Sequence, residues 1–582
     1  MKNERQSYSG LLATYLRPQK GQVALLTLLL LGSIGLQLAN PQLVRAFIDT
    51  AQTGGGLNQL LGAGAIFMAV AIARQFVNII ATYVGENVAW TATNALRADL
   101  ARHCLRLDMS FHKVHKPGEL IERVDGDVNK LANFFSRLVI RLTSNLLLLI
   151  GVLALLWALD WGVGLCITLI SLAGAVYLHH LNRRIVPRWE ALRQSEADLF
   201  GHLEEWLNGT EEIRSSGAAA AIMQQLHRLS RARWLSMRHG MRLNVFVITL
   251  PITVFTLAYV AAHVLGATLF RNGALSIGSI YLIFYYIDVI KGPLWEILRQ
   301  VEDLQRAAAS LNRVASLFAE QPTILDGPGA AFGDGALAAS FTDVSFHYAD
   351  APEQPVLADV TFHLAPGRVL GLLGRTGSGK STLTKLLFRF YDPTQGVIAL
   401  NGVDIRAATQ RELRQRIGMV TQEVELFHAS VRDNLTLFDP TVSNAQIERV
   451  TQEVGLSAWL AGLPDGLDTP LAGSHSLSAG QAQLLAFARV FLADPGLVVL
   501  DEASSRLDPA TEQLIEQAMN RLLAGRTAII VAHRLGTVQR ADEIMILERG
   551  RVVEHGERAR LASDPETRFF QLLQTGLEEA IA

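Results

Sequence analysis

Long apolar runs dominate the first half of the chain and stop near Leu298. Crossing the hydrocarbon core of a bilayer takes about 20 mostly apolar residues in a helix, and six stretches of this half are long enough. The pattern therefore predicts a bundle of six membrane helices. The candidate spans are residues 22–47, 58–83, 138–158, 160–182, 243–269 and 276–298.

Basic residues are distributed unevenly between these spans. The segment between spans two and three, which includes Lys113 and Lys116, and the segment between spans four and five are long and rich in Lys and Arg. The other three connections are short and nearly free of them. Under the positive-inside rule, both long segments and both termini lie in the cytoplasm. Charge asymmetry and span length together disfavour the alternative of large buried helices in a soluble protein. We expect a multi-pass protein of the cytoplasmic (inner) membrane, in contact with the lipid bilayer.

Several polar side chains fall inside the candidate spans. Charges at bilayer depth are costly and usually face a cavity or a partner charge, so these residues could line a substrate pathway. The structural alternative is that Asp288 and Lys291, three residues apart on one helix face, pair with each other, and that Arg141 lies near the cytoplasmic end. Both interpretations remain open from the sequence. The residues concerned are Arg74, Asn78, Arg141, Asp288 and Lys291.

The pattern changes in the second half of the chain. From about Phe341 it consists of short strands, glycine turns and amphipathic helices, which is typical of a soluble α/β domain. The stretch between the halves, residues 321–339, is rich in Gly, Pro and Ala and is predicted to be a linker. We therefore expect a transmembrane domain over 1–320 and a second domain over 340–582.

A glycine-rich loop, GRTGSGKST (374–382), follows the apolar strand Val369–Leu373 and opens a helix. The apolar residues of that helix, from Leu383 to Phe390, fall on one face. This strand–loop–helix context is what a phosphate-binding loop requires, and it disfavours a glycine-rich loop of another kind.

Each residue type in the loop has a part in binding phosphate. The glycines let the backbone N–H groups turn toward phosphate oxygens, helped by the helix N-terminus. Lys380 is expected to reach the β- and γ-phosphates, and the Ser381 hydroxyl to ligate Mg²⁺. The predicted nucleotide-binding residues of the loop are Gly374, Thr376, Gly377, Ser378, Gly379, Lys380, Ser381 and Thr382.

Two later strands deliver polar residues. The wholly apolar run 497–500 ends in Asp501-Glu502, where the first carboxylate can hold the Mg²⁺ shell and the second can polarise the attacking water. An acidic pair opening a surface loop is the weaker alternative, because the strand is apolar up to Asp501. The strand at 528–532 delivers His533, which can hydrogen-bond the γ-phosphate.

This order of motifs resembles an ABC transporter of the exporter type, a half-transporter in which a six-helix membrane bundle is fused to one α/β P-loop ATP-binding cassette. The resemblance covers nearly the whole chain. It implies an ATPase coupled to transport, with ATP and Mg²⁺ as cofactors. It also implies that MSFHKVHKPGELIERVDGDV (109–128) and EEWLNGTEEIRSS (204–216) are the two cytoplasmic loops whose coupling helices touch the cassettes.

The resemblance assigns further residues of the cassette. In VSFHY, Tyr348 stacks on adenine; in VTQE, Gln422 senses Mg²⁺ and the attacking water. In SRLD, Asp508 lies in the loop that crosses the dimer interface, and in VAHR, His533 is the switch histidine. The signature, SLSAGQ, contributes Ser478, Gly480 and Gln481 to the ATP held by a second cassette.

The signature departs from the usual LSGGQ at one glycine. Ala479 costs roughly 1 kcal/mol if its position needs a positive φ and is nearly silent otherwise. Ala482 and Leu484 also stand where the family often has arginines. Intact Glu502 beside an altered signature resembles one subunit of a heterodimeric exporter, so we expect a second, different half-transporter as partner. A homodimer with a tolerated alanine is the alternative.

The remaining features narrow the function. The formal net charge of -2 and the absence of a basic domain disfavour a nucleic-acid partner. The two cysteines indicate neither a disulfide framework nor a zinc site, and the N-terminal sequence resembles no removable signal peptide. ATP-driven export of a small or amphipathic substrate is the leading prediction. An importer of a siderophore-like ligand on the exporter fold, a regulatory ATPase that transports nothing and a soluble P-loop enzyme are the alternatives, and the fold does not fix the substrate.

Overall fold

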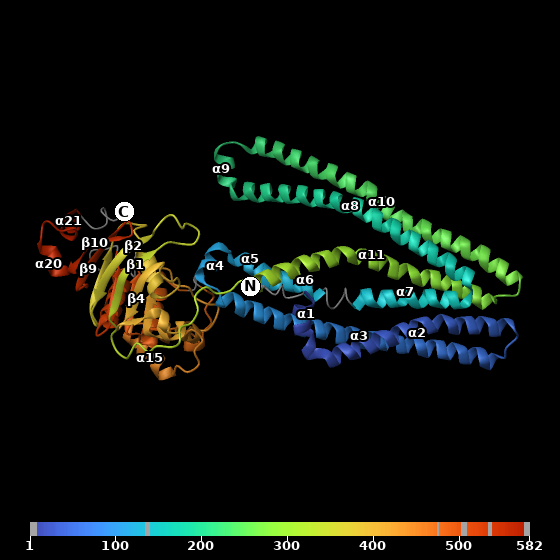
Figure 1. The fold of residues 1–582 in the computed structure, drawn as a ribbon, viewed down its shortest axis with the longest axis horizontal. Coiled ribbons are helices and arrows are strands. Elements are labelled where there is room, and N and C mark those ends of the chain that lie inside the picture. Colours follow the sequence, from blue (N-terminus) through green and yellow to red (C-terminus); the bar gives the residue numbers. More distant parts are fainter. Residues whose placement is uncertain (1–7, 134–139, 474–476, 502–508, 533–537, 576–582) are drawn as a thin grey trace. The chain divides into compact units, whose positions relative to one another are not determined.

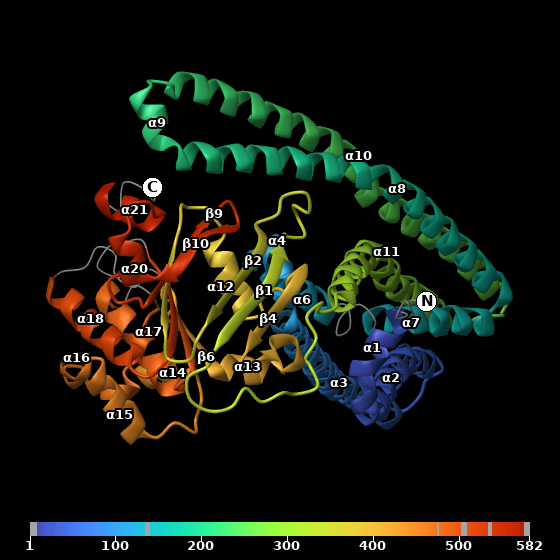
Figure 2. The same cartoon turned by 60° about the vertical axis from the view of Figure 1, so that its left-hand side comes forward.

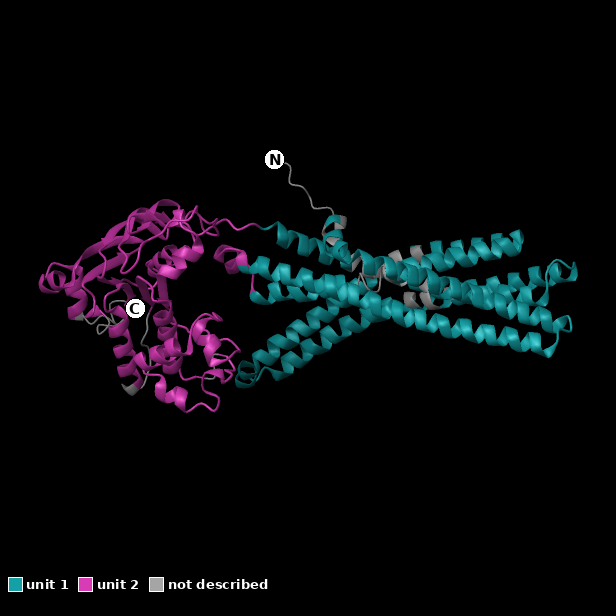
Figure 3. Cartoon of the chain, turned by 90° about the horizontal axis from the view of Figure 1, so that it is seen from below, with its two compact units in different colours: residues 1–105, 117–320 teal, residues 106–116, 321–582 magenta. Residues whose placement is uncertain are grey.

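The computed structural model describes residues 8–133, 140–473, 477–501, 509–532 and 538–575 of the chain. The chain divides into two compact units (Figure 3). The first unit comprises residues 1–105 and 117–320, and the second comprises residues 106–116 and 321–582. The short segment 106–116 therefore belongs to the C-terminal unit, although the sequence on both sides of it belongs to the first.

The described residues of the first unit form helices joined by turns and short loops. Six of its helices overlap the six predicted spans, and the others are short. The bounds are α1 Tyr8–Leu16, α2 Lys20–Gln52, α3 Leu57–Arg106, α5 Pro117–Ile121, α6 Val128–Asn133, α7 Ile140–Leu159, α8 Trp161–Asn208, α9 Thr210–Ser215, α10 Ala219–Arg271 and α11 Ile277–Ala319.

The described residues include five helical stretches long and apolar enough to cross a membrane: one runs from the end of α1 through α2, and the others belong to α3, α7, α10 and α11. The sixth long helix, α8, is apolar over the shorter stretch Trp161–Tyr177. Several helices continue far beyond their apolar part. At 1.5 Å per residue, the 50 residues of α3 span about 75 Å, more than twice a hydrocarbon core of about 30 Å. Figures 1 and 2 show α8 and α10 running side by side to the short helix α9.

Helix α11 supplies much of the core of the first unit. Ile283, Tyr286, Ile287 and Ile290 recur at helical spacing and are each at most 1% exposed, packed with residues of α7 and α10. The Tyr286 hydroxyl is satisfied within the bundle, because it accepts a hydrogen bond from the Gln42 amide at 3.0 Å. A buried face of this kind fixes which side of α11 packs against its neighbours.

Four of the five polar side chains expected inside the spans have partners, whereas the buried Arg74 Nε has none among the described residues, and Asn78 accepts a hydrogen bond from Ser33 at 2.7 Å. Lys291 donates to the Asp288 carboxylate at 2.6 Å and to the Tyr259 hydroxyl at 3.0 Å. Arg141 lies 3.6 Å from Glu296. The pairing expected under the structural interpretation of Asp288 and Lys291 is therefore present.

A buried ion pair joins the end of α11 to the segment before α6. The Asp127 side chain is 1% exposed and accepts hydrogen bonds from the Arg313 guanidinium at 2.6 and 2.8 Å and from the Ser310 hydroxyl at 3.0 Å. Burial alone would raise the pKa of Asp127, but hydrogen bonds from Arg313, Ser310 and Lys130 outweigh it and lower that pKa. Because the Arg313 side chain is 47% exposed, only the loss of Arg313 would leave a buried charge, the Asp127 carboxylate, without its main partner.

The second unit is built on two sheets. The four-stranded sheet has the order β2-β1-β4-β5, and the six-stranded sheet has the order β10-β9-β3-β8-β7-β6. In the second sheet only the β10–β9 pair is antiparallel. The bounds are β1 Ala339–Phe346, β2 Leu357–Leu364, β3 Val369–Leu373, β4 Gln395–Leu400, β5 Val403–Asp404, β6 Ile417–Val420, β7 Leu497–Asp501, β8 Thr527–Val531, β9 Glu543–Glu548 and β10 Arg551–Glu557.

Helices cover the six-stranded sheet. In β7, Leu497 and Val499 pack into the core shared with the four-stranded sheet and α12, whereas Val498 and Leu500 pack into the core shared with α17 and α18. This alternation is the period-2 pattern of a strand buried on both faces. The helix bounds are α4 Met109–Val114, α12 Lys380–Leu387, α13 Gln410–Arg416, α14 Val431–Thr436, α15 Asn444–Glu453, α16 Ser457–Ala461, α17 Ala479–Ala493, α18 Pro509–Leu523, α20 Arg558–Ser563 and α21 Arg568–Thr575.

The segment predicted to be a linker, residues 321–339, belongs to the second unit. Phe332 and Leu337 within it are 4% and 0% exposed and pack into the core of the two sheets. Strand β1 begins at Ala339. The apolar residues of this Gly- and Ala-rich segment thus hold it against the second unit.

Candidate functional site

The parallel part of the six-stranded sheet gathers the predicted nucleotide residues. Strands β3, β8, β7 and β6 are neighbours in this order and run parallel, so their carboxyl ends share one edge. Ligands of open α/β sheets bind outside this edge. Asp501 pairs with Val531 across β7 and β8, and Val531 pairs with Leu372 across β8 and β3, so the strand ends are level.

The predicted residues follow these strand ends one by one. The loop 374–379 follows β3, Asp501 closes β7, and exposed Gln422 lies two residues after the end of β6. Glu502, His533 and Asp508 lie outside the described residues, so their roles stay predictions from the sequence.

Glycines of the loop after β3 occupy left-handed backbone conformations. The φ angles of Gly374, Gly377 and Gly379 are 149°, 82° and 106°, values that an L side chain rarely adopts. A Cβ added at Gly379 would lie 2.7 Å from the Leu357 side chain and 3.0 Å from the Val356 carbonyl oxygen. The loop therefore needs glycine at these positions to bring successive backbone N–H groups to one concave side.

The polar side chains of this loop are placed at two depths. Lys380 is 6% exposed and donates hydrogen bonds to the carbonyl oxygens of Gly374 and, at 3.1 Å, Arg375, so its ammonium lies under the loop. The Ser378 hydroxyl is buried without a hydrogen-bond partner in the described part of the chain. Thr376 and Ser381 are exposed, the latter in the first turn of α12.

These residues fit a Mg-nucleotide. A triphosphate suits left-handed glycines, a buried ammonium and a helix N-terminus in one loop. Mg²⁺ prefers oxygen ligands and commonly takes only one or two from protein, with phosphates and water supplying the rest. Ser381 in the first turn of α12, Asp501 at the end of β7 and Gln422 just after β6 offer such oxygens. Within the described residues, no group of three or more His, Cys, Asp or Glu side chains is placed to hold a metal.

Tyr348 lies beside this loop after strand β1. Its hydroxyl is 3.0 Å from the Thr382 hydroxyl, and Thr382 is 6% exposed in the first turn of α12. The ring makes edge-to-face contacts with Phe346 and Tyr391, with centroids 5.0 and 5.2 Å apart. The predicted adenine-stacking residue and the phosphate loop are therefore adjacent.

The signature residues form the N-terminus of α17. Ser478 is the N-cap: the Gln481 backbone N–H donates to its hydroxyl at 3.2 Å, and the Ser478 N–H donates to the Gln481 side chain at 3.1 Å. This reciprocal pair is a capping box. Gly480 is buried, and a Cβ there would overlap the methyl group of Thr511 on α18.

Ala479 occupies a position that alanine tolerates. It is the first residue of α17, is exposed, and is not among the described residues with positive φ. The strained case considered from the sequence therefore does not apply. Ala482 and Leu484 are 9% and 2% exposed within the core around α17.

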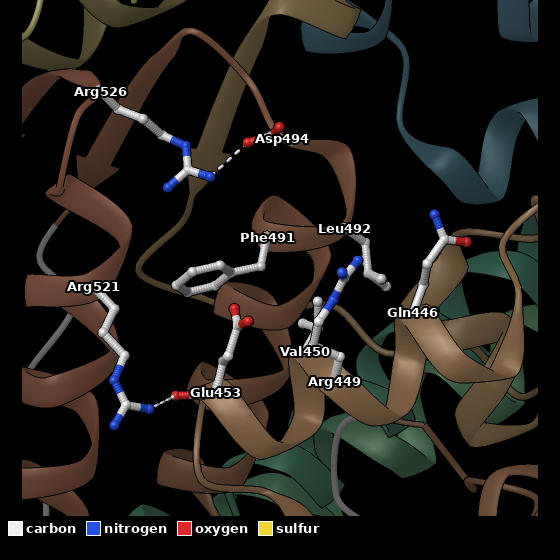
Figure 4. A pocket seen from close by; sticks show the side chains of 9 residues that line it. All are labelled: Gln446, Arg449, Val450, Glu453, Phe491, Leu492, Asp494, Arg521 and Arg526. Atoms are coloured by element: carbon white, nitrogen blue, oxygen red, sulfur yellow. Dashed lines mark hydrogen bonds and ion pairs between the residues drawn. The ribbon is translucent and has the colours of Figure 1, made fainter. Parts of the chain in front are cut away.

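A cavity of about 630 Å³ lies among α15, α17 and α18 (Figure 4). Arg449, Glu453, Phe491 and Arg521 are among its lining residues. No predicted site residue lines it, and its lining has mixed charge, with three arginines, one glutamate and one aspartate. It is therefore separate from the strand edge that gathers the predicted nucleotide residues.

Sequence reasoning missed two features of this unit. The capping box could have been predicted from the sequence, because Ser478 and Gln481 have the S-x-x-Q spacing of that motif. The second is Lys113 of α4, which lies 4.2 Å above the Tyr348 ring centroid. No local pattern predicts that contact, because 235 positions separate Lys113 from Tyr348.

Known proteins share this architecture. Residues 23–294 match the family described as ABC transporter transmembrane region, and residues 357–505 match the family described as ABC transporter. The ABC transporter ATP-binding protein YknV of Bacillus subtilis is 30% identical over 564 residues, covering 94% of this chain and 91% of that protein. A fatty acid ABC transporter ATP-binding/permease protein of Mycobacterium bovis is 32% identical over 468 residues, covering 80% of this chain and 74% of that protein. The chain belongs to the ABC transporter family.

A solved structure shares the fold over nearly the whole chain. A bacterial Atm1-family ABC exporter with ATP bound superposes with a TM-score of 0.77 at 23% identity, covering 96% of this chain and 98% of that one. The chain is a half-transporter of the exporter type, with one transmembrane region and one ATP-binding cassette, and it is an ATPase coupled to transport. The predicted exporter-type half-transporter and the predicted fold class are confirmed.

Proposed function

We propose that this chain is one half of a dimeric exporter in the cytoplasmic membrane, which uses Mg-ATP to move a small or amphipathic substrate outward by alternating access. The observation that carries the proposal is the shared edge of β3, β7 and β6, which groups the phosphate loop, Asp501 and Gln422. The name of the mycobacterial relative, a fatty acid transporter, favours an amphipathic substrate. The interconversion would follow the usual linkage, in which ATP favours closed cassettes and hydrolysis resets them.

Within the nucleotide site, the residues have distinct proposed roles. Lys380 and the loop N–H groups bind the β- and γ-phosphates, and Tyr348 stacks on adenine. Ser381, Asp501 and Gln422 would hold the Mg²⁺ that neutralises phosphate charge. Glu502 polarises the attacking water and His533 bonds the γ-phosphate.

The signature is proposed to act on the ATP of a second chain. Ser478, Gly480 and Gln481 begin a helix whose N-terminus favours an anion, and Asp508 lies in the loop expected at the same interface. The capping box leaves the Ser478 hydroxyl hydrogen available, because that hydroxyl accepts from Gln481 and can still donate to a phosphate oxygen.

The second chain is proposed to be a different half-transporter. Intact Glu502 beside a signature that departs at Ala479, Ala482 and Leu484 supports this pairing. The geometry of Ala479, which fits a helix start without strain, favours the homodimer alternative at that position. Robust ATP hydrolysis by a symmetric dimer of the purified chain would contradict the heterodimer.

Transport direction separates the exporter from an importer on the same fold. The test uses the full chain, with its partner subunit if one is required, in inside-out vesicles. A fluorescent amphipathic probe is added to the external medium. ATP-dependent accumulation of the probe supports export, and ATP-dependent loss from preloaded vesicles supports import. ATP hydrolysis that no amphipathic solute stimulates would instead support a regulatory ATPase. Glu502→Gln is the matched control, since it should bind ATP without turnover.

A further inference from the structure

Helix α4 meets the cassette at the predicted adenine site. Lys113, in the last turn of α4, places its ammonium 4.2 Å above the centroid of the Tyr348 ring. The same ammonium donates to both carboxylate oxygens of Asp350, at 2.9 and 3.1 Å. All three residues belong to the second compact unit, which includes 106–116 (Figure 3).

Charge supports this contact at neutral pH. Hydrogen bonding to Asp350 raises the pKa of Lys113, and the same bond lowers the pKa of the Asp350 carboxyl. Both groups are therefore ionised, as a cation over an aromatic face requires.

Tyr348 is held on other sides as well. Its hydroxyl is bonded to Thr382 on the phosphate-loop helix at 3.0 Å. Phe346 and Tyr391 contact the ring edge to face. A cavity of about 390 Å³ adjoins it, lined among others by Ser110, Lys113, Thr323, Tyr348, Asp350 and Tyr391, a volume within the range of small-ligand sites of about 300–1,000 Å³.

This arrangement would conflict with a base stacked on the face of Tyr348 that Lys113 covers. A base stacked on Tyr348 lies about 3.5–4.0 Å from the ring, at van der Waals contact, and on the face that Lys113 covers this layer is filled by the ammonium. The Thr382 hydroxyl, expected to serve a phosphate, is bonded to Tyr348. Nucleotide binding on that face therefore has to move Lys113 off the ring.

We propose that Lys113 and the adenine base compete for Tyr348, so that α4 detects ATP through the release of Lys113. Without nucleotide, Lys113 bridges Asp350 and the Tyr348 ring and keeps α4 on the adenine site. When ATP stacks on Tyr348, the bridge breaks and α4 is freed from this site. The inference rests on the proposed function, because it takes adenine stacking on Tyr348 from it.

The test compares nucleotide affinities of the full-length chain in lipid nanodiscs, by calorimetry without Mg²⁺ so that no ATP is hydrolysed. Lys113→Met keeps the length of the side chain but removes the charge. We expect ATP to bind about 2- to 5-fold more tightly, the size of an exposed cation–π contact. The affinity for inorganic tripolyphosphate, which has no base, should stay the same. Lys113→Arg keeps the cation and should bind ATP as the unmodified chain does.

Two further variants complete the test. Asp350→Asn leaves Lys113 without its carboxylate and should tighten ATP binding in the same direction but by less. Lys116→Met removes a nearby lysine for which the described residues show no ion pair, and it should change nothing. Unchanged or weaker ATP binding in Lys113→Met, or equal tightening for tripolyphosphate, would overturn the competition. If the unmodified chain failed to bind ATP at all, the proposed function would fail instead.

Discussion

The loop 374–379 and the signature 478–481 both contain glycine, but their glycines meet different physical demands. Gly377 and Gly379 have positive φ angles of 82° and 106°, so backbone conformation selects glycine. Gly480 lies inside the right-handed helix α17, and the methyl group of Thr511 selects it by proximity. Ala479, next to it, meets neither demand.

This difference explains why one loop keeps its glycines and the other has lost one. A methyl group at a left-handed position strains the backbone whatever the surrounding space. A methyl group at the exposed first position of a helix costs nothing of that kind, since alanine is a favourable helix residue. The departure from the usual signature sequence at residue 479 is therefore a poor indicator of altered function. The backbone conformation and the contacts at each position are a better indicator.

The largest effect is expected for Gly379→Ala. It combines a strained φ, at roughly 1–2 kcal/mol, with a Cβ 2.7 Å from Leu357, so ATP affinity should fall at least about tenfold at 1.4 kcal/mol per factor of ten. Gly377→Ala is the matched control, because it has a positive φ but no atom within 4 Å of the added Cβ. Equal ATP dissociation constants for the unmodified chain and Gly379→Ala would contradict the conformational argument.

Gly480→Ala should have the next largest effect, and a second substitution should compensate for it. The new methyl group overlaps that of Thr511, and overpacking of this kind costs about 1–3 kcal/mol, seen as a lower melting temperature. Adding Thr511→Ser removes the opposing methyl group and should restore most of the loss. Restoration by Thr511→Ser in Gly379→Ala as well would show that the two loops do not differ as described.

Ser478→Ala tests whether the signature serine does more than cap α17. Losing the cap costs about 1 kcal/mol of stability and should be accompanied by slower ATP hydrolysis. Ser478→Asp keeps a capping acceptor for Gln481 but adds a negative charge toward the phosphate. We expect it to retain the melting temperature and lose hydrolysis. If Ser478→Asp hydrolysed ATP normally, the residue would be a cap alone.

The smallest effect is expected for Ala479→Gly, which restores the usual signature. Because Ala479 is exposed and starts a right-handed helix, the ATPase rate should change less than about twofold, corresponding to under 0.5 kcal/mol. A tenfold gain in rate would mean that the alanine methyl group itself limits the site.

The sequence predicted the elements that have strong periodic signals. Strand β3 ends where the glycine loop was expected to begin, and α12 buries Leu383, Leu386 and Leu387 as the helical pattern required. Phe390 was expected on the same helix face, but α12 ends at Leu387, so that residue lies beyond the helix. The prediction for Phe390 was wrong, because apolar spacing alone does not show where a helix ends.

Features that depend on distant contacts were not predictable in this way. Hydropathy located the spans but not the polar continuations of the long helices, such as α8 to Asn208 and α11 to Ala319, because only the apolar part of a helix exceeds a hydropathy threshold. The burial of Asp127 under Arg313 and the contact of Lys113 with Tyr348 depend on tertiary packing. No local pattern in one sequence records such pairs.

The most direct test of the central claim is equilibrium binding of Mg-ATP to the full-length chain in lipid, with Lys380→Ala and Glu502→Gln in parallel. We expect the unmodified chain to bind and hydrolyse ATP, and Glu502→Gln to bind ATP without hydrolysing it. We expect Lys380→Ala to lose both ATP binding and ATP hydrolysis. Binding to Lys380→Ala with undiminished affinity would contradict it, since the nucleotide would then be held somewhere other than the loop after β3.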